Sequence, residues 1–108
     1  MNVLCEQVER TLRIRVHGDI NRFELAALKR ALAATADMEE VTLDLSEVDF
    51  AGSDFINLLL EARHADPDGF ARILVLNPSE LVEELIDLSG LRPLLRVRKT
   101  EIAPMPAV

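Results

Sequence analysis

An almost continuous apolar run, Ala71 to Leu76, constrains the fold of this chain more than any other feature. Apolar residues at successive positions are typical of a strand in a parallel sheet that is covered on at least one face. A turn signal, Asp-Pro-Asp-Gly at residues 66–69, precedes the run. Residues 77–80 follow as a helix start, with Asn77 predicted as the N-cap and Pro78 in the first turn. The run therefore predicts a buried strand between two other elements.

Other segments alternate between strand-like and helix-like periodicity. Strands are predicted at residues 3–9, 12–16, 41–45 and 94–97, with Val48 and Phe50 adding apolar content after the third. Helices are predicted at residues 23–35, 53–65 and 78–89. Parallel strands need crossover connections, here supplied by the helices. The order predicts an α/β fold, a mixed sheet of about five strands with three main helices packed on it.

Individual residues are assigned to the core and to the helix ends. Asn21 is predicted to cap the first helix, whose inner face carries Leu25, Leu28 and Leu32. The last helix is predicted to bury Leu81, Leu85 and Leu88 and to end at Gly90 in the left-handed conformation. Cys5, the one cysteine, lies in a strand-like segment and is expected to be a small buried residue.

Length and charge limit the classes of function. The 108 residues suffice for one domain, expected at residues 1–99, with a flexible tail at 100–108. The net charge is −7, and residues 37–68 hold ten acidic side chains against one basic one, which argues against nucleic-acid binding. No apolar run approaches the roughly 18 residues of a membrane helix, so no direct membrane insertion is expected. The lone cysteine fits a cytoplasmic setting.

The sequence offers no constellation for catalysis. His17, His64 and Cys5 are not in metal-ligand spacing. The chain has no glycine-rich phosphate loop and no nucleophile elbow. We therefore expect no enzyme, no metal site and no cofactor.

Ser53 begins a predicted helix and has two interpretations. As an N-cap, its hydroxyl would accept a bond from a first-turn N–H and stabilise the helix by roughly 1 kcal/mol. As a phospho-acceptor, it would place a phosphate at the positive end of the helix dipole. The residues alone leave both interpretations open.

The chain resembles the STAS domain, in particular the bacterial anti-sigma factor antagonists (anti-anti-sigma factors), over residues 3–99. Three segments carry the resemblance: residues 41–50 followed by Gly52-Ser53, residues 55–65, and residues 85–91 with a Ser-Gly-Leu helix ending. Residues 17–21 are also similar to the family's segment before the first helix. The resemblance implies the predicted fold in a domain that binds another protein.

Ser53 falls on the position that is phosphorylated in this family. The resemblance implies an anti-sigma factor antagonist that binds an anti-sigma factor when unphosphorylated and releases it when Ser53 is phosphorylated. The implied partner has a kinase-like ATP-binding fold, and ATP belongs to that partner. The expected partner-binding residues are Asp19, Asn21, Ala51, Gly52, Ser53, Asp54, Asn57 and Glu61.

Gly52, Asp54 and Phe55 depart from the family's usual Asp-Ser-Ser/Thr-Gly-Leu segment. Two alternatives stay open, of which Gly52 and Phe55 favour the first. The first is a STAS interaction subunit of a larger assembly, such as a lipid-transport complex or a signalling scaffold, that is never phosphorylated. The second is a small-ligand sensor, which predicts a pocket near Asp19 and Ser53. The sequence leaves open the oligomeric state, the sigma factor and the upstream signal.

Overall fold

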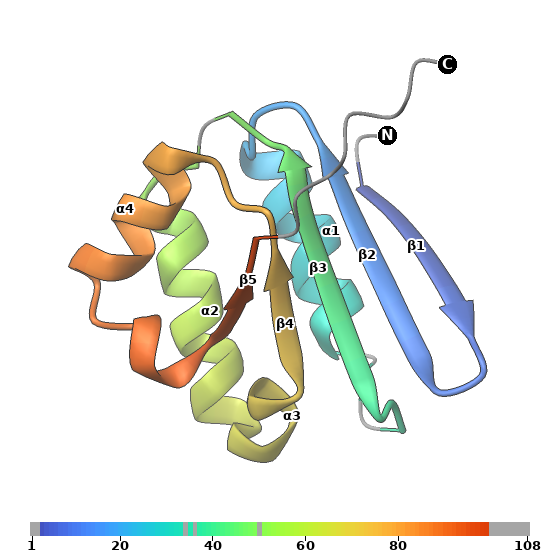
Figure 1. Cartoon of the computed structure of the whole chain (residues 1–108). Helices are drawn as coiled ribbons and strands as arrows, with labels where there is room; N and C mark the ends of the chain where they lie inside the picture. Colours follow the sequence, from blue (N-terminus) through green and yellow to red (C-terminus); the bar gives the residue numbers. More distant parts are fainter. Residues whose placement is uncertain (1–2, 34, 36, 50, 100–108) are drawn as a thin grey trace.

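The chain folds into one sheet with helices packed on it (Figure 1). The computed structural model describes residues 3–33, 35, 37–49 and 51–99. The strands are β1 (Val3–Val8), β2 (Thr11–His17), β3 (Glu40–Glu47), β4 (Ile73–Leu76) and β5 (Arg96–Arg98). The helices are α1 (Arg22–Ala33), α2 (Ser53–Ala65), α3 (Pro67–Ala71), α4 (Glu80–Leu88) and the 3-10 turn η1 (Arg92–Leu94). The predicted contribution of Phe50 and the predicted tail at 100–108 lie outside the described residues.

The sheet has the mixed topology that the sequence predicts. Its strand order is β1-β2-β3-β4-β5. β1 and β2 form an antiparallel hairpin, and Glu9 in their turn has a φ of 55°. The remaining neighbours are parallel, so each connection crosses over through a helix. The α/β prediction with five strands is confirmed.

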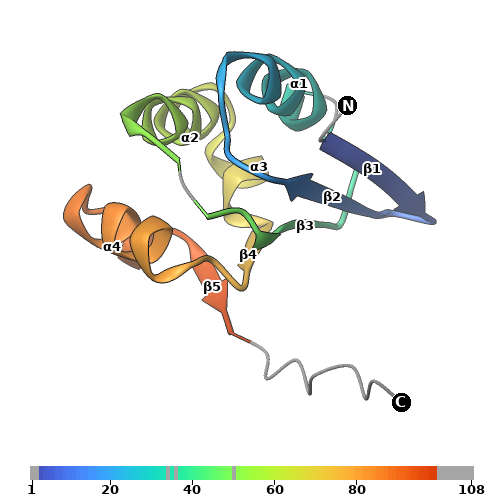
Figure 2. The same ribbon diagram turned by 90° about the horizontal axis from the view of Figure 1, so that it is seen from above.

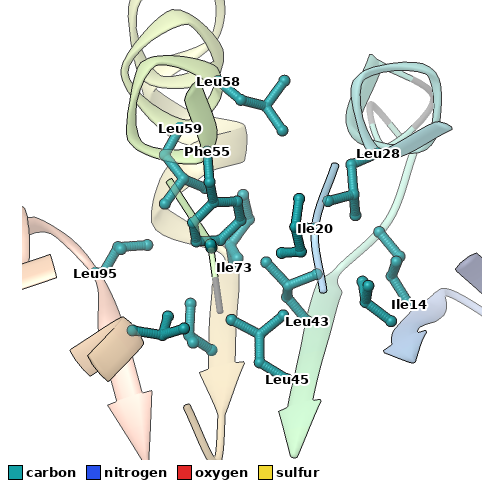
Figure 3. Packing of buried hydrophobic residues seen from close by; sticks show 14 of the residues in the cluster. Ile14, Ile20, Leu28, Leu43, Leu45, Phe55, Leu58, Leu59, Ile73 and Leu95 are labelled. Atoms are coloured by element: carbon teal, nitrogen blue, oxygen red, sulfur yellow. The ribbon is translucent and has the colours of Figure 1, made fainter. Parts of the chain in front are cut away.

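The helices cover one side of the sheet. Figure 2 shows α1, α2 and α3 above the sheet and α4 beside β5, also on that side. The core lies between these two layers, where Phe55 and Leu59 of α2 and Leu28 of α1 are fully buried against the sheet (Figure 3). Burying one such side chain contributes roughly 1.5–3 kcal/mol. This packing holds α2 in place, so that its first residue lies near the carboxyl ends of β2 and β3.

The start of α4 lies two residues later than predicted. Asn77 has a φ of 52°, a left-handed conformation, whereas an N-cap residue takes an extended one. The cap is Ser79, whose Oγ accepts a hydrogen bond from the Val82 N–H at 3.2 Å. The prediction of Asn77 as the N-cap is wrong, because two residues with capping side chains flank Pro78.

The face that α4 buries also differs from the prediction. Val82 and Ile86 are fully buried, whereas Leu81 and Leu88 are 62% and 79% exposed and Leu85 is only partly buried. The prediction of a buried Leu81, Leu85 and Leu88 stripe is therefore wrong. Five of the nine residues of this helix are apolar and aliphatic, so helical spacing alone allows either face to pack inward.

A glycine, a turn and the cysteine were also predicted from the sequence. Gly90 has a φ of 79° and ends α4 as predicted, and Leu91 is buried beside it. The predicted turn at residues 66–69 continues into α3, because Asp66 Oδ1 accepts from the Gly69 N–H at 3.0 Å and caps a short helix. The prediction that Cys5 is buried is wrong: it lies on the edge strand β1, of which only Val3 is buried, and its side chain is exposed.

Candidate functional site

Two loops meet at the carboxyl ends of β2 and β3. Ile20 and Ala51 form an isolated parallel β-bridge, and both side chains are buried. The bridge holds the loop before α1 beside the loop before α2. In open α/β sheets, ligands commonly bind outside the carboxyl ends of the strands. The predicted residues Asp19, in the first loop, and Ser53, the first residue of α2, therefore lie at the same edge of the sheet.

The first loop leaves β2 through a glycine. Gly18 has a φ of 83°, and its N–H donates to the Glu47 carbonyl oxygen at 2.9 Å. His17 Nδ1 lies 2.7 Å from Glu47 Oε2, which adds a second link between β2 and β3. These two links set the direction of the loop and leave Asp19 exposed.

Asn21 has a structural role in addition to the predicted binding role. Its Oδ1 accepts hydrogen bonds from the N–H groups of Phe23 (2.9 Å) and Glu24 (3.5 Å). The Asn21 N–H in turn donates to Glu24 Oε1 at 3.2 Å. This reciprocal pair is a capping box, so the prediction that Asn21 caps the first helix is confirmed.

Ser53 is the first residue of α2 and not its cap. The cap position belongs to Gly52, which has no side chain to accept a first-turn N–H. The N-cap interpretation of Ser53 is therefore wrong. Ser53 is exposed, and its hydroxyl makes no hydrogen bond to the described residues. Phe55, by contrast, is fully buried in the core and adds no bulk to the surface around Ser53.

The predicted residues of α2 line a shallow groove between α1 and α2. Asp54, Asn57 and Glu61 are exposed and border this groove of about 310 Å³. Its other lining residues are Leu25, Ala26, Lys29 and Leu58. Lys29 was not predicted from the sequence as a site residue. Its position one turn after Leu25, beside the inner face of α1, could have indicated that it borders the groove. Of the remaining predicted residues, Ala51 is buried and Gly52 is partly exposed.

A larger cavity lies toward the C-terminal end of α2 and shares Lys29, Leu58 and Glu61 with the groove. It has a volume of about 410 Å³ and is bordered by α1, α2 and α3, with Leu32, Ala62 and Phe70 among its walls. Neither this cavity nor the shallow groove is lined by Asp19 or Ser53. The groove is lined by Asp54, the neighbour of Ser53, so the pocket that the small-ligand alternative predicts near Asp19 and Ser53 stays a prediction.

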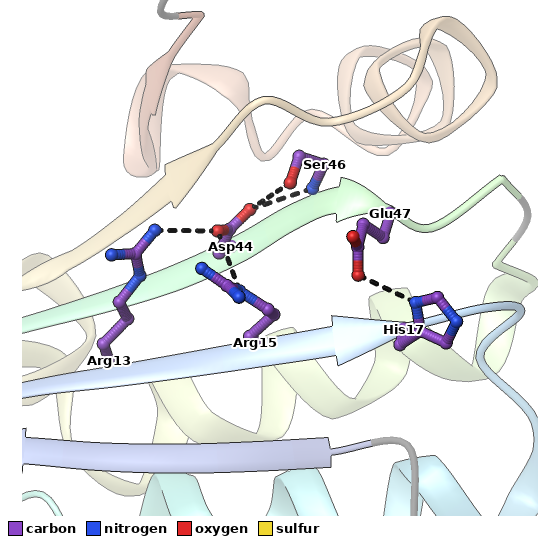
Figure 4. A network of polar contacts seen from close by, with 6 residues as sticks. All are labelled: Arg13, Arg15, His17, Asp44, Ser46 and Glu47. Atoms are coloured by element: carbon purple, nitrogen blue, oxygen red, sulfur yellow. Dashed lines mark hydrogen bonds and ion pairs between the residues drawn. The ribbon is translucent and has the colours of Figure 1, made fainter. Parts of the chain in front are cut away.

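A polar network stabilises the helix-free face of the sheet (Figure 4). The Asp44 side chain, only 5% exposed, lies within 3.1 Å of Arg13 Nη2 and 3.5 Å of Arg15 Nε. Its Oδ1 accepts from Ser46 N–H (3.0 Å) and Ser46 Oγ (2.7 Å). Burial opposes ionisation, but the Ser46 and Arg13 hydrogen bonds outweigh it and lower the pKa of Asp44 below its ordinary value. The network ties β2 to β3 beneath the two loops.

The described residues hold neither a metal-binding cluster nor a membrane-spanning helix. No group of three or more His, Cys, Asp or Glu side chains in the described ranges could hold a metal ion. No helix in this part of the chain is long and apolar enough to cross a membrane.

A comparison of sequences agrees with the fold. A family model described as "Mlab, STAS domain" matches residues 4–96. The chain belongs to the STAS domain family. No curated protein sequence matches the chain.

Solved structures with the same fold include anti-sigma factor antagonists. The unphosphorylated form of SpoIIAA is 24% identical, with 92% of this chain and 89% of that chain covered and a TM-score of 0.74. An anti-sigma factor antagonist from Mycobacterium paratuberculosis is 23% identical, with 92% and 86% covered and a TM-score of 0.75. The phosphorylated Bacillus SpoIIAA is 21% identical, with 92% of both chains covered and a TM-score of 0.69. At these identities the likeness shows the fold.

Proposed function

We propose that this STAS domain is an anti-sigma factor antagonist. In this proposal it binds an anti-sigma factor with a kinase-like ATP-binding fold through the Asp19–Asn21 loop, residues 51–54 and the outward side of α2. Phosphorylation of Ser53 releases the partner. The chain itself performs no catalysis, since the kinase and its ATP belong to the partner, and both proteins act in the cytoplasm.

The observation that carries the proposal is the state of the Ser53 side chain. The hydroxyl is exposed at the first residue of α2 and is not used for capping. A phosphate can be added there without loss of a structural hydrogen bond. The Phe55 N–H donates to the Gly52 carbonyl oxygen at 3.0 Å, and because Gly52 has no capping side chain, the N–H groups of Ser53 and Asp54 stay available to the phosphate oxygens.

The expected effect of the phosphate is electrostatic. It adds about −1.5 to −2 charges at neutral pH. Asp54 lies in the same helical turn, and Asp19 lies on the loop joined to Ala51 by the β-bridge. The added charge therefore raises the density of negative charge on a surface that is already acidic. A partner that fits the neutral serine meets like-charge repulsion and loses a close contact.

A kinase assay with intact-mass detection tests this function. The cognate anti-sigma kinase and ATP are expected to add one phosphate to the parent chain and none to Ser53→Ala. Ser79→Ala is the matched control, since Ser79 also stands at a helix start but caps it, and it should gain the phosphate like the parent. A phosphate on Ser53→Ala, or none on the parent, contradicts the proposal.

A second function is favoured by Gly52, which stands where the family usually has an acid, and by the Mlab description of the matching family model. In this alternative the domain is an interaction subunit of a larger assembly and is never phosphorylated. Pull-downs with Ser53→Asp and Ser53→Ala separate the two. The switch predicts that only Ser53→Asp loses the partner, and equal binding by both variants favours the interaction subunit.

A further inference from the structure

Helix α4 exposes leucine side chains that its core packing does not use. Leu81 and Leu88 are 62% and 79% exposed, and Leu85 between them is partly buried. Their spacing of four and three residues places all three on one face of the helix. Val82 and Ile86, each one position later than Leu81 and Leu85, hold α4 on the core. The leucine face therefore borders the core without being needed to build it.

Ion pairs of α4 fix the direction in which the leucines face. Glu83 pairs with Arg92 and Lys99, and Asp87 pairs with Arg92 at 3.2 Å. These two acids therefore face η1 and β5. On the helix, the leucine face lies on the other side of the buried Val82 and Ile86. It consequently faces toward α2, the neighbour of α4 in Figure 1.

A fourth leucine comes from α2. Leu58 and Glu61 border the groove on the α1 side of this helix. Leu60, which is 42% exposed, lies on the opposite flank by helical geometry, and that flank faces α4. We call Leu60, Leu81, Leu85 and Leu88 the leucine surface. The two helices that carry it contact each other.

The border of the leucine surface is acidic. Glu80 and Glu84 are exposed on the outward side of α4, beside the leucines. Neither carboxylate has an ion-pair partner within the described residues, whereas Glu83 pairs with Arg92 and Lys99, and Asp87 pairs with Arg92. The surface thus combines exposed leucines with unpaired negative charge. A partner that fits it needs both an apolar face and basic side chains.

We infer that the leucine surface docks an amphipathic helix of a partner protein whose apolar stripe is flanked by Lys or Arg. Apolar residues of such a helix at spacings of three and four meet the leucines. Its basic residues meet Glu80 and Glu84, which gives orientation and selectivity. A second copy of this chain fits less well, since two-fold packing of this face brings like charges together. An anionic lipid surface is repelled by the same carboxylates.

This docking needs neither Ser53 nor its phosphate, so it holds or fails separately from the proposed switch. The probe is a labelled amphipathic leucine–lysine peptide, titrated by fluorescence anisotropy. The full chain is expected to bind this peptide. It is not expected to bind a peptide with glutamate in place of lysine. The double variant Leu81→Ser/Leu88→Ser should weaken binding at least about tenfold, because the two largest exposed contacts are lost.

Matched variants separate specific docking from general stickiness. Leu4→Ser/Val8→Ser removes two equally exposed apolar side chains on β1 (59% and 62%) and should leave binding unchanged. Glu80→Lys/Glu84→Lys should reverse the preference toward the glutamate peptide. The inference is overturned if the α4 and β1 variants bind alike, or if both peptides bind alike. A dimer in light scattering that the leucine substitutions abolish would assign the surface to a second copy and also overturn it.

Discussion

Replacement of Asp44 by alanine is expected to destabilise the fold by about 2–3 kcal/mol. The Asp44 side chain is only 5% exposed in the strand β3 and accepts two hydrogen bonds from Ser46. A hydrogen bond to a charged group contributes roughly 1.5–3 kcal/mol when well buried. Ser46 is exposed and forms hydrogen bonds to water when Asp44 is removed. Each of its two bonds therefore contributes about 1 kcal/mol to the free energy of unfolding.

The two arginines add less than a buried ion pair would. Their side chains are 47% and 46% exposed, so each guanidinium stays hydrated after the carboxylate is removed. Both arginines contact the same oxygen, Asp44 Oδ2, so together they count as about one exposed pair, which contributes roughly 0.2–1 kcal/mol. The total predicts a fall in melting temperature of about 10–20 °C for a domain of this size. Asp44→Asn keeps an oxygen for Ser46 and should cost about half as much.

Denaturant unfolding of Asp44→Asn and the parent, followed by circular dichroism over a range of pH, measures the charge-dependent part. The lowered pKa of Asp44 in the folded state means that its carboxylate stabilises the fold above the unfolded-state pKa, near 3.8. This stabilisation is lost as the pH falls through the lower folded pKa. The difference between the parent and Asp44→Asn should therefore be full at pH 7 and shrink in acid.

Asp37→Asn serves as the control, because Asp37 is exposed and its side chain makes no ion pair with the described residues. It should change the free energy of unfolding by less than about 0.5 kcal/mol. The reasoning is refuted if Asp44→Ala is as stable as Asp37→Asn, or if the Asp44→Asn difference stays constant with pH.

Two glycines give opposite expectations. Gly90→Ala should destabilise the domain by about 1–2 kcal/mol in denaturant unfolding, since its φ of 79° strains an L-residue although no atom lies within 4 Å of an added Cβ; an unchanged midpoint would contradict this. Gly52→Asp should stabilise it by about 0.5–1 kcal/mol, because the backbone at Gly52 is extended, the space is open and a carboxylate can cap α2. A lower melting temperature for Gly52→Asp would contradict the view that α2 lacks a side-chain cap.

The fold could be predicted because its signals are local and agree with one another. Turn residues and alternation place the hairpin, and helical spacing places α2 at the observed residues 53–65. Errors arose where two positions offered the same chemistry. Asn77 and Ser79 can both cap a helix, and the crowded leucines and Val82 of α4 allow two packing faces. Only the contact of α4 with the rest of the fold selects between them.

The candidate site was predictable in outline and not in detail. That Asp19 and Ser53 share an edge follows from parallel strands, but the Ile20–Ala51 bridge that joins their loops is a contact between distant residues. The state of the Ser53 hydroxyl depends on a shift of one residue at the start of α2. Such a shift decides whether the Ser53 hydroxyl caps α2 or is free, and no local sequence pattern fixes a helix start to one residue.

The exposure of Cys5 has a practical consequence. It is the one cysteine of the chain, and its thiol is exposed on β1, at the sheet edge farthest from β5. A maleimide dye should therefore attach at a single defined position in the unaltered sequence. That position is remote from the first residue of α2 and from α4. Förster transfer from this dye to a labelled partner would report which side of the domain the partner occupies.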